Sequence, residues 1–125
     1  MKVAGIGFRA SATLADLRQA LDLLQTQPDA LASLQAKAAA EPLKTLAREL
    51  GLPLIALAEE DIAGEQTLTC SPRIKARFAT GSLAEAAALV GARQARPGAR
   101  ARLIAPRIVT ANGLATAALA ERLDP

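Results

Sequence analysis

The sequence predicts an α/β fold of three layers, α/β/α, on a mixed, mostly parallel sheet of about five strands whose last strand is antiparallel. Apolar runs alternate with amphipathic segments over the first 57 residues, which is the βαβαβ pattern of a parallel sheet. Two more strand-like runs flank Asn112-Gly113, a turn signal. Because the 125 residues hold no linker-like tract, we expect a single domain over residues 1–125.

The chain begins with a strand over residues 3–8, whose nearly continuous apolar residues are typical of a central strand covered on both faces. Two glycines in it leave room for a ligand or for a second backbone. One cation and two hydroxyl groups follow, close to a helix N-terminus whose free N–H groups favour anions. This turn is a candidate seat for a carboxylate or a phosphate, with candidate binding residues Gly5, Gly7, Arg9, Ser11 and Thr13.

Leucine spacing and helix signals identify the next four elements. Leucines three and four residues apart predict a helix over residues 14–27, which a capping box at residues 13–16 begins. Residues 31–37 predict a second strand. Residues 42–50 predict a second helix, with a proline in its first turn and a glycine directly after its end. Residues 52–57 predict a third strand, at whose start a proline is tolerated.

The middle of the chain is less regular. The acidic residues 59–66 predict a short helix or a loop, and residues 66–80 predict an irregular loop of the length that is often functional or mobile. Ser82 and Glu85 form a second capping box. An alanine-rich helix is expected to continue from it to about residue 90 and to pack close to a sheet.

The last two strands are predicted over residues 102–107 and 114–120. Pro106 places the first of them near an edge of the sheet, because proline has no N–H to donate. The short connection favours an antiparallel pair. A closing helix over the last stretch is the alternative.

The composition excludes several kinds of site. The chain has no histidine, so it offers neither a histidine-containing zinc site nor a histidine-based triad, and we expect no metal and no other cofactor. The single cysteine, Cys70, excludes an internal disulfide and suits a reducing compartment. There is no signal-peptide pattern and no apolar run close to the ~20 residues of a membrane span. We therefore expect a soluble, cytoplasmic protein without a membrane partner.

Charge is distributed unevenly. Residues 1–66 carry six Lys and Arg against nine Asp and Glu, whereas residues 67–125 carry nine against three, so an anionic partner would bind the second half. Nucleic acid is not expected, because only two phenylalanines are available for stacking on bases. A solvated basic face and a site for a small molecule with several carboxylates both stay open. The basic residues concerned are Arg73, Lys75, Arg77, Arg93, Arg96, Arg100, Arg102 and Arg107.

A dinucleotide is also not favoured. Gly5-Ile6-Gly7 is half of a dinucleotide fingerprint, with Ala10 at the third position, and the second strand ends in Lys37 where an acidic residue would bind ribose. Lys37 is either a ligand contact or a solvated strand end, and Ser71 is either a turn residue or a ligand hydroxyl. The N–H groups of Gly81-Ser82 either bind an anion or only begin a helix.

Six segments, in order and over essentially the full length, form one pattern. They are Gly5-Ile6-Gly7-Phe8-Arg9 with Ser11 and Thr13, Lys37-Ala38 with Glu41-Pro42, Leu50-Gly51-Leu52-Pro53-Leu54, Ser71-Pro72, Gly81-Ser82-Leu83-Ala84-Glu85-Ala86, and Ala101-Arg102-Leu103-Ile104-Ala105-Pro106-Arg107. The pattern resembles the cobalamin biosynthesis family of CobE and the CbiG C-terminal domain, and most of all its stand-alone members. Where that family often has Cys after Gly-Ile-Gly, this chain has Phe8, which excludes a thiol role there.

The resemblance implies a role in building the corrin ring, namely binding of a carboxylate-rich precorrin or corrinoid intermediate in or around the aerobic ring-contraction steps. CbiG-type proteins open a lactone ring of a precorrin, so a lactone hydrolase is one alternative and a nucleotide- or anion-binding module is another. Other enzymes of the pathway are further candidate partners. Whether the chain is an enzyme and whether it self-associates stay open. The expected binding residues are Gly5, Gly7, Arg9, Ser11, Thr13, Lys37, Ser71, Gly81, Ser82, Glu85 and Arg107.

Overall fold

The computed structural model describes residues 1–94 and 98–123, so Arg96 of the basic set lies outside the described residues. The strands are β1 (Lys2–Phe8), β2 (Ala30–Leu34), β3 (Leu54–Leu57), β4 (Arg100–Val109) and β5 (Ala115–Leu123). They form one sheet in the order β3-β2-β1-β5-β4. β1, β2 and β3 are parallel, and β5 runs antiparallel to both of its neighbours, β1 and β4. The predicted mixed sheet, with its last strand antiparallel and its fourth strand at an edge, is confirmed.

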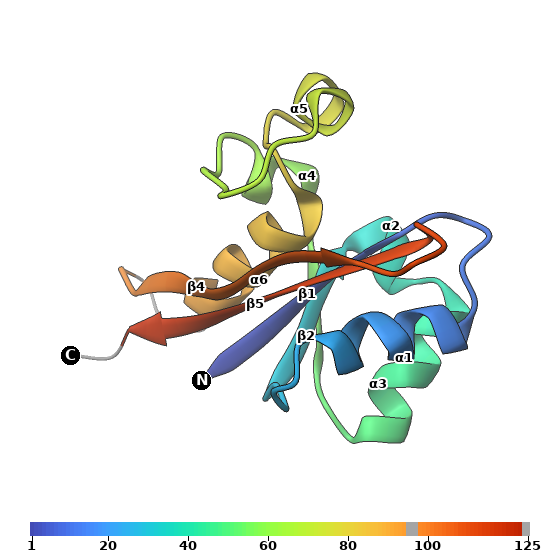
Figure 1. The fold of residues 1–125 in the computed structure, drawn as a ribbon. Coiled ribbons are helices and arrows are strands. Elements are labelled where there is room, and N and C mark those ends of the chain that lie inside the picture. Colours follow the sequence, from blue (N-terminus) through green and yellow to red (C-terminus); the bar gives the residue numbers. More distant parts are fainter. Residues whose placement is uncertain (95–97, 124–125) are drawn as a thin grey trace.

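Helices lie on both faces of this sheet (Figure 1). The helices are α1 (Leu14–Leu23), α2 (Gln35–Ala38), α3 (Glu41–Leu50), α4 (Glu59–Ile62), α5 (Pro72–Phe78) and α6 (Leu83–Gln94). α1 and α3 pack on one face, and α6 packs on the other. The three-layer arrangement is therefore confirmed. α5 stands away from the sheet, beyond α4, at the top of Figure 1.

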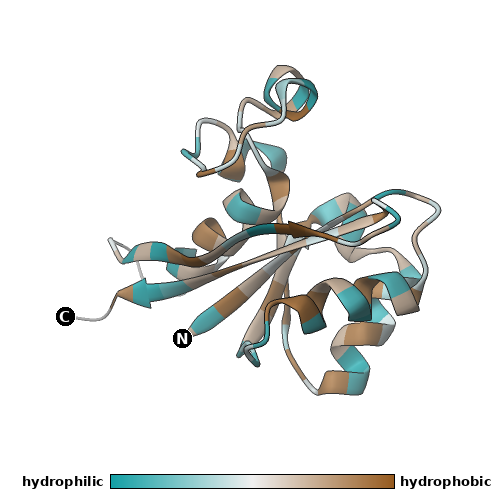
Figure 2. Cartoon of the chain, in the orientation of Figure 1, coloured by the Kyte–Doolittle hydropathy of each residue, from teal (hydrophilic) through white to brown (hydrophobic). Residues whose placement is uncertain are grey.

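The two faces of the sheet are packed by different side chains. Large leucines fill the face under α1 and α3, among them Leu17, Leu21 and Leu46, and polar residues of α1 alternate with them along the helix (Figure 2). The other face meets the alanines of α6. A Cβ at Gly5 would overlap the Ala84 carbonyl oxygen, so the backbone of α6 lies directly on β1. Of the two roles considered for this glycine, contact with a second backbone is the one that the structure shows.

Two predicted elements end earlier than expected. The helix predicted to residue 27 ends at Leu23, because Gln25 adopts a left-handed conformation with φ of 57°. The strand predicted over residues 31–37 ends at Leu34, and the chain continues as α2. Lys37 therefore lies in a short helix rather than at a strand end. Gln, Ala and Lys favour helix over strand when no packing opposes them, which explains the difference.

The loop predicted over residues 66–80 contains a helix, α5. Ser71 is its N-cap, and its hydroxyl accepts from the Ile74 N–H at 3.5 Å, while Pro72 occupies the first turn. No residue of α5 is buried. A short helix without a buried face leaves no strong apolar periodicity in a sequence, so the pattern indicated only irregular structure.

The capping box at the start of α1 is confirmed and gives a pH prediction. The Asp16 carboxylate accepts from the Thr13 N–H at 2.9 Å and from the Asn112 side-chain amide at 2.8 Å. These bonds, the Thr13 bond first, hold the pKa of Asp16 below its ordinary value of 3.8. A carboxylate whose pKa is lower in the folded state stabilises the fold at a pH above its ordinary pKa. This stabilisation is lost as the pH falls through the lowered pKa.

Asp16→Asn is therefore expected to make the loss of thermal stability below about pH 4 shallower than in the wild type. Thermal unfolding followed by circular dichroism across this acid range measures it. Glu60→Gln, which changes an exposed carboxylate outside this contact, is the control variant. An Asp16→Asn profile parallel to the wild type would contradict the prediction.

Candidate ligand-binding site

A cavity of about 360 Å³ lies at the C-terminal end of β1. We call it the first cavity. Its walls are the end of β1 with the residue after it, the start of β5, the end of β4, the N-terminus of α6 and the first turn of α5. In open α/β sheets, ligands bind beyond the carboxyl ends of the strands, which is where this cavity lies. Its lining residues are Gly7, Phe8, Arg9, Ser71, Arg73, Ile74, Ser82, Leu83, Ala84, Arg107, Val109, Gly113, Leu114 and Thr116.

Three arginines line the first cavity: Arg9, Arg73 and Arg107. Within the described part of the chain, none of these guanidinium groups has an ion-pair partner. Four arginines elsewhere are paired: Arg18 with Glu49, Arg77 with Glu59, Arg93 with Glu65, and Arg102 with Glu121. The first cavity therefore concentrates uncompensated positive charge, to which the N-terminus of α6 adds its own field.

A buried carboxylate joins two walls of this cavity. Glu85, in the first turn of α6, is 0% exposed. Its Oε1 accepts from the Thr69 N–H at 2.9 Å, and its Oε2 accepts from the Arg107 N–H at 2.8 Å. β4 departs from regular register between Ala105 and Ile108, which releases this N–H from the ladder. Glu85 thus fixes the backbone that carries one cavity arginine.

The predicted capping box at Ser82 and Glu85 is half correct. The Ser82 hydroxyl accepts from the Glu85 N–H at 3.3 Å, as predicted. The Glu85 side chain makes its hydrogen bonds to Thr69 and Arg107 instead of returning to the Ser82 backbone. Two backbone donors from distant segments lie within its reach and satisfy both carboxylate oxygens, whereas a capping box would satisfy one.

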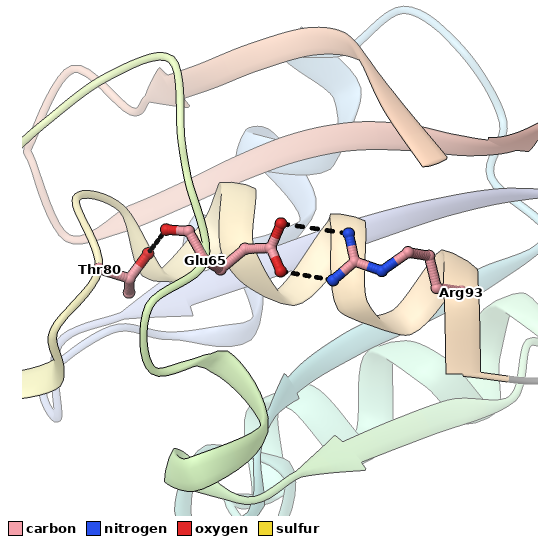
Figure 3. Close-up of polar contacts among 3 residues, drawn as sticks. All are labelled: Glu65, Thr80 and Arg93. Atoms are coloured by element: carbon pink, nitrogen blue, oxygen red, sulfur yellow. Dashed lines mark hydrogen bonds and ion pairs between the residues drawn. The ribbon is translucent and has the colours of Figure 1, made fainter. Parts of the chain in front are cut away.

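Hydrogen bonds hold the two ends of the segment that carries α5, and those among Glu65, Thr80 and Arg93 are drawn in Figure 3. Glu65, between α4 and α5, forms two hydrogen bonds with the Arg93 guanidinium of α6, and the Thr80 hydroxyl donates to the Glu65 carbonyl at 2.7 Å. The Ser71 N–H donates to the Gly81 carbonyl at 2.8 Å. These contacts hold both ends of the segment against α6. α5 therefore overhangs the first cavity from a fixed base.

The structure brings five of the eleven predicted residues together and separates the others. Those that line the first cavity are Gly7, Arg9, Ser71, Ser82 and Arg107. Gly5 lies under α6, and a Cβ at Gly81 would lie 2.5 Å from the Thr67 hydroxyl, so both glycines are covered by the chain itself. Glu85 is buried behind the wall. Thr13 caps α1, and Ser11 is exposed in the turn before it.

Lys37 lies beside the first cavity and does not line it. Its ammonium nitrogen is 4.9 Å from the centroid of the ring of Phe8, and Phe8 lines the first cavity. The sequence predicted Arg73 only as one member of a general basic set, because residues 66–80 showed no pattern of the helix that positions this side chain at the cavity. Thr116 gave no signal at all, since its position follows from the pairing of β5 with Gly7 on β1.

Within the described residues, no helix has both the length and the apolar character needed to cross a membrane. The same residues contain no group of three or more His, Cys, Asp and Glu side chains that could hold a metal ion. No carboxylate, imidazole or thiol stands among the described lining of the first cavity. Its chemistry is that of hydrogen-bond donors and cations around small and apolar side chains.

One family model and two solved structures that are similar to this chain carry names from cobalamin biosynthesis. Residues 2–120 match the family of the cobalamin synthesis G C-terminus. The crystal structure of CobE, a protein from the cobalamin (vitamin B12) biosynthetic pathway, is similar at 31% identity and a TM-score of 0.81, over 99% of this chain and 91% of that one. The cobalamin biosynthesis protein chiG of Agrobacterium tumefaciens is similar at 33% identity and a TM-score of 0.69, over 99% and 100%. Among curated proteins, none matches.

Proposed function

Because this chain belongs to the cobalamin synthesis G C-terminus family, we propose that its first cavity binds the carboxylate side chains of a precorrin or corrinoid intermediate. The chain is a protein of cobalamin biosynthesis, like the two solved structures that it resembles. Corrin precursors carry many carboxylates around an apolar macrocycle. The observation that supports the proposal is a set of three arginines around one cavity, none of which has an ion-pair partner among the described residues. Arginine matches carboxylates geometrically through two parallel N–H bonds.

Binding is favoured over catalysis by what lines the cavity. A lactone hydrolase needs a group to activate water, and the described lining offers no Asp, Glu, His or Cys for that role. Glu85, the nearest buried carboxylate, has both oxygens engaged by backbone N–H groups. We therefore propose a protein that holds or hands over a pathway intermediate, in or around the ring-contraction steps.

Replacing a cavity arginine by alanine is expected to weaken binding of a metal-free corrin polycarboxylate, hydrogenobyrinic acid, about tenfold to a hundredfold. A hydrogen bond between charged groups contributes about 1.5–3 kcal/mol, which corresponds to this range. Titration followed by the visible absorbance of the corrin measures the dissociation constant for Arg9→Ala, Arg73→Ala and Arg107→Ala.

The matched control is Arg102→Ala, because this arginine lies on the same strand as Arg107 and is already paired with Glu121 at 2.7 Å. It should bind the corrin as the wild type does. A second control is the fully methyl-esterified corrin, which keeps the macrocycle and loses the negative charges, and which should bind weakly. Equal affinity for acid and ester would contradict carboxylate recognition, and tighter binding of ATP or NAD than of any corrinoid would favour the nucleotide alternative.

A further inference from the structure

A second cavity, of about 390 Å³, lies at the C-terminal ends of the two other parallel strands. Its lining includes Leu34 at the end of β2, Leu57 at the end of β3, and Lys37 of α2. Arg77 and Phe78 of α5 close it from above. The second cavity therefore occupies the same edge of the sheet as the first, displaced from the end of β1 toward β3.

The two cavities share one boundary and one roof. The boundary is the contact of Phe8, which lines the first cavity, with Lys37, which lines the second. The roof is α5, whose first turn lines the first cavity and whose last turn lines the second. A helix of seven residues is about 10 Å long, so it covers both openings along one edge.

We propose that the two cavities form a single crevice under α5 that takes one flat macrocycle, with Lys37 binding a carboxylate where the two cavities meet. This inference rests on the function proposed above. Pockets for small ligands measure about 300–1,000 Å³, and each cavity alone stands at the small end of that range. A tetrapyrrole with its side chains needs both.

The unequal charges of the two cavities determine how the macrocycle is oriented in this crevice. Three arginines line the first cavity, and in the described part of the chain none of them is in an ion pair. In the second, Arg77 is paired with Glu59 at 2.7 Å and Glu60 adds a negative charge, which leaves Lys37 as the cation without an ion pair among the described lining residues. The edge of the ligand that carries more carboxylates therefore faces the first cavity, and a single carboxylate reaches Lys37.

The test measures hydrogenobyrinic acid binding and the chemical reactivity of Lys37. Lys37→Ala is expected to weaken binding about tenfold, whereas Lys37→Arg, which keeps the charge, should stay close to the wild type. Lys44→Ala is the matched control, because Lys44 is a lysine of α3 paired with Glu41. In the wild type, bound corrin should protect Lys37 from an acetylating reagent, as read by mass spectrometry, and leave Lys44 reactive.

The possible outcomes separate this inference from the proposed function. Two results would contradict the single crevice and leave binding in the first cavity intact. One is acetylation of Lys37 at the same rate with and without bound corrin. The other is wild-type affinity in Lys37→Ala together with weakened binding in Arg107→Ala. If the wild type binds no corrin, the proposed function fails first. Weaker binding by Lys37→Ala without protection of Lys37 would show a structural effect through Phe8 and would also overturn the inference.

Discussion

Gly5→Ala is expected to lower the free energy of unfolding by about 3 kcal/mol or more, enough to leave little folded protein. An added Cβ would overlap the Ala84 carbonyl oxygen and lie 2.6 Å from the Ala88 nitrogen. Both are backbone atoms of α6, so no side-chain rotation relieves the clash. α6 would have to move off the central strand, and the buried alanines that pack there would lose their contacts. Urea unfolding followed by circular dichroism measures the change.

The matched control is Gly7→Ala, two residues along the same strand. Its Cβ would lie 2.8 Å from the Thr116 hydroxyl, the end of a side chain that can rotate away. This variant is expected to fold and to lose less stability than Gly5→Ala. Equal stability of Gly5→Ala and the wild type would mean that α6 does not lie against β1 as described.

Glu85→Gln is expected to cost about 2–3 kcal/mol of unfolding free energy and also to weaken corrin binding, although residue 85 does not line the cavity. The amide keeps one acceptor oxygen and turns its NH₂ toward the other backbone N–H. Either Thr69 or Arg107 then loses its partner. A buried N–H without a partner costs free energy, and the strand that carries the Arg107 guanidinium loses its anchor.

Urea unfolding and the corrin titration, made on the same protein, check both effects. Glu41→Gln is the control, because Glu41 lies on the surface of α3 and only meets Lys44 at 3.6 Å. It is expected to change neither quantity by more than about 0.5 kcal/mol. A Glu85→Gln variant as stable as the wild type would show that the two backbone contacts contribute little.

The parts of this fold that were predictable from the sequence are those with local signals. The Thr13 and Asp16 box, the left-handed Gly51 after α3 and the turn at Asn112-Gly113 each follow from residues next to one another. The parallel order of the first three strands follows from their alternation with helices. These features required no knowledge of distant contacts.

The features that escaped prediction depend on distant contacts. Glu85 forms a plausible local cap with Ser82, and only the folded chain brings the N–H groups of Thr69 and Arg107 to its oxygens. The sequence pattern placed Lys37 at the end of a strand, whereas in the fold it lies in α2. The sequence predicted an anion-binding turn at Arg9, but Arg73 and Arg107 line the same cavity only through the position of α5 and the register of β4.

The strand order also decides when the protein can fold during its synthesis. Of the five described strands, β5 comes last in sequence order yet lies between β1 and β4, so it pairs with both. Until residues 115–123 leave the ribosome, β1 has an open edge and β4 has no neighbour in the sheet. A ribosome stalled before these residues should therefore carry a chain that is protease-sensitive and open to association through β1. Of the five described strands, the one made last therefore joins β4 to the rest of the sheet.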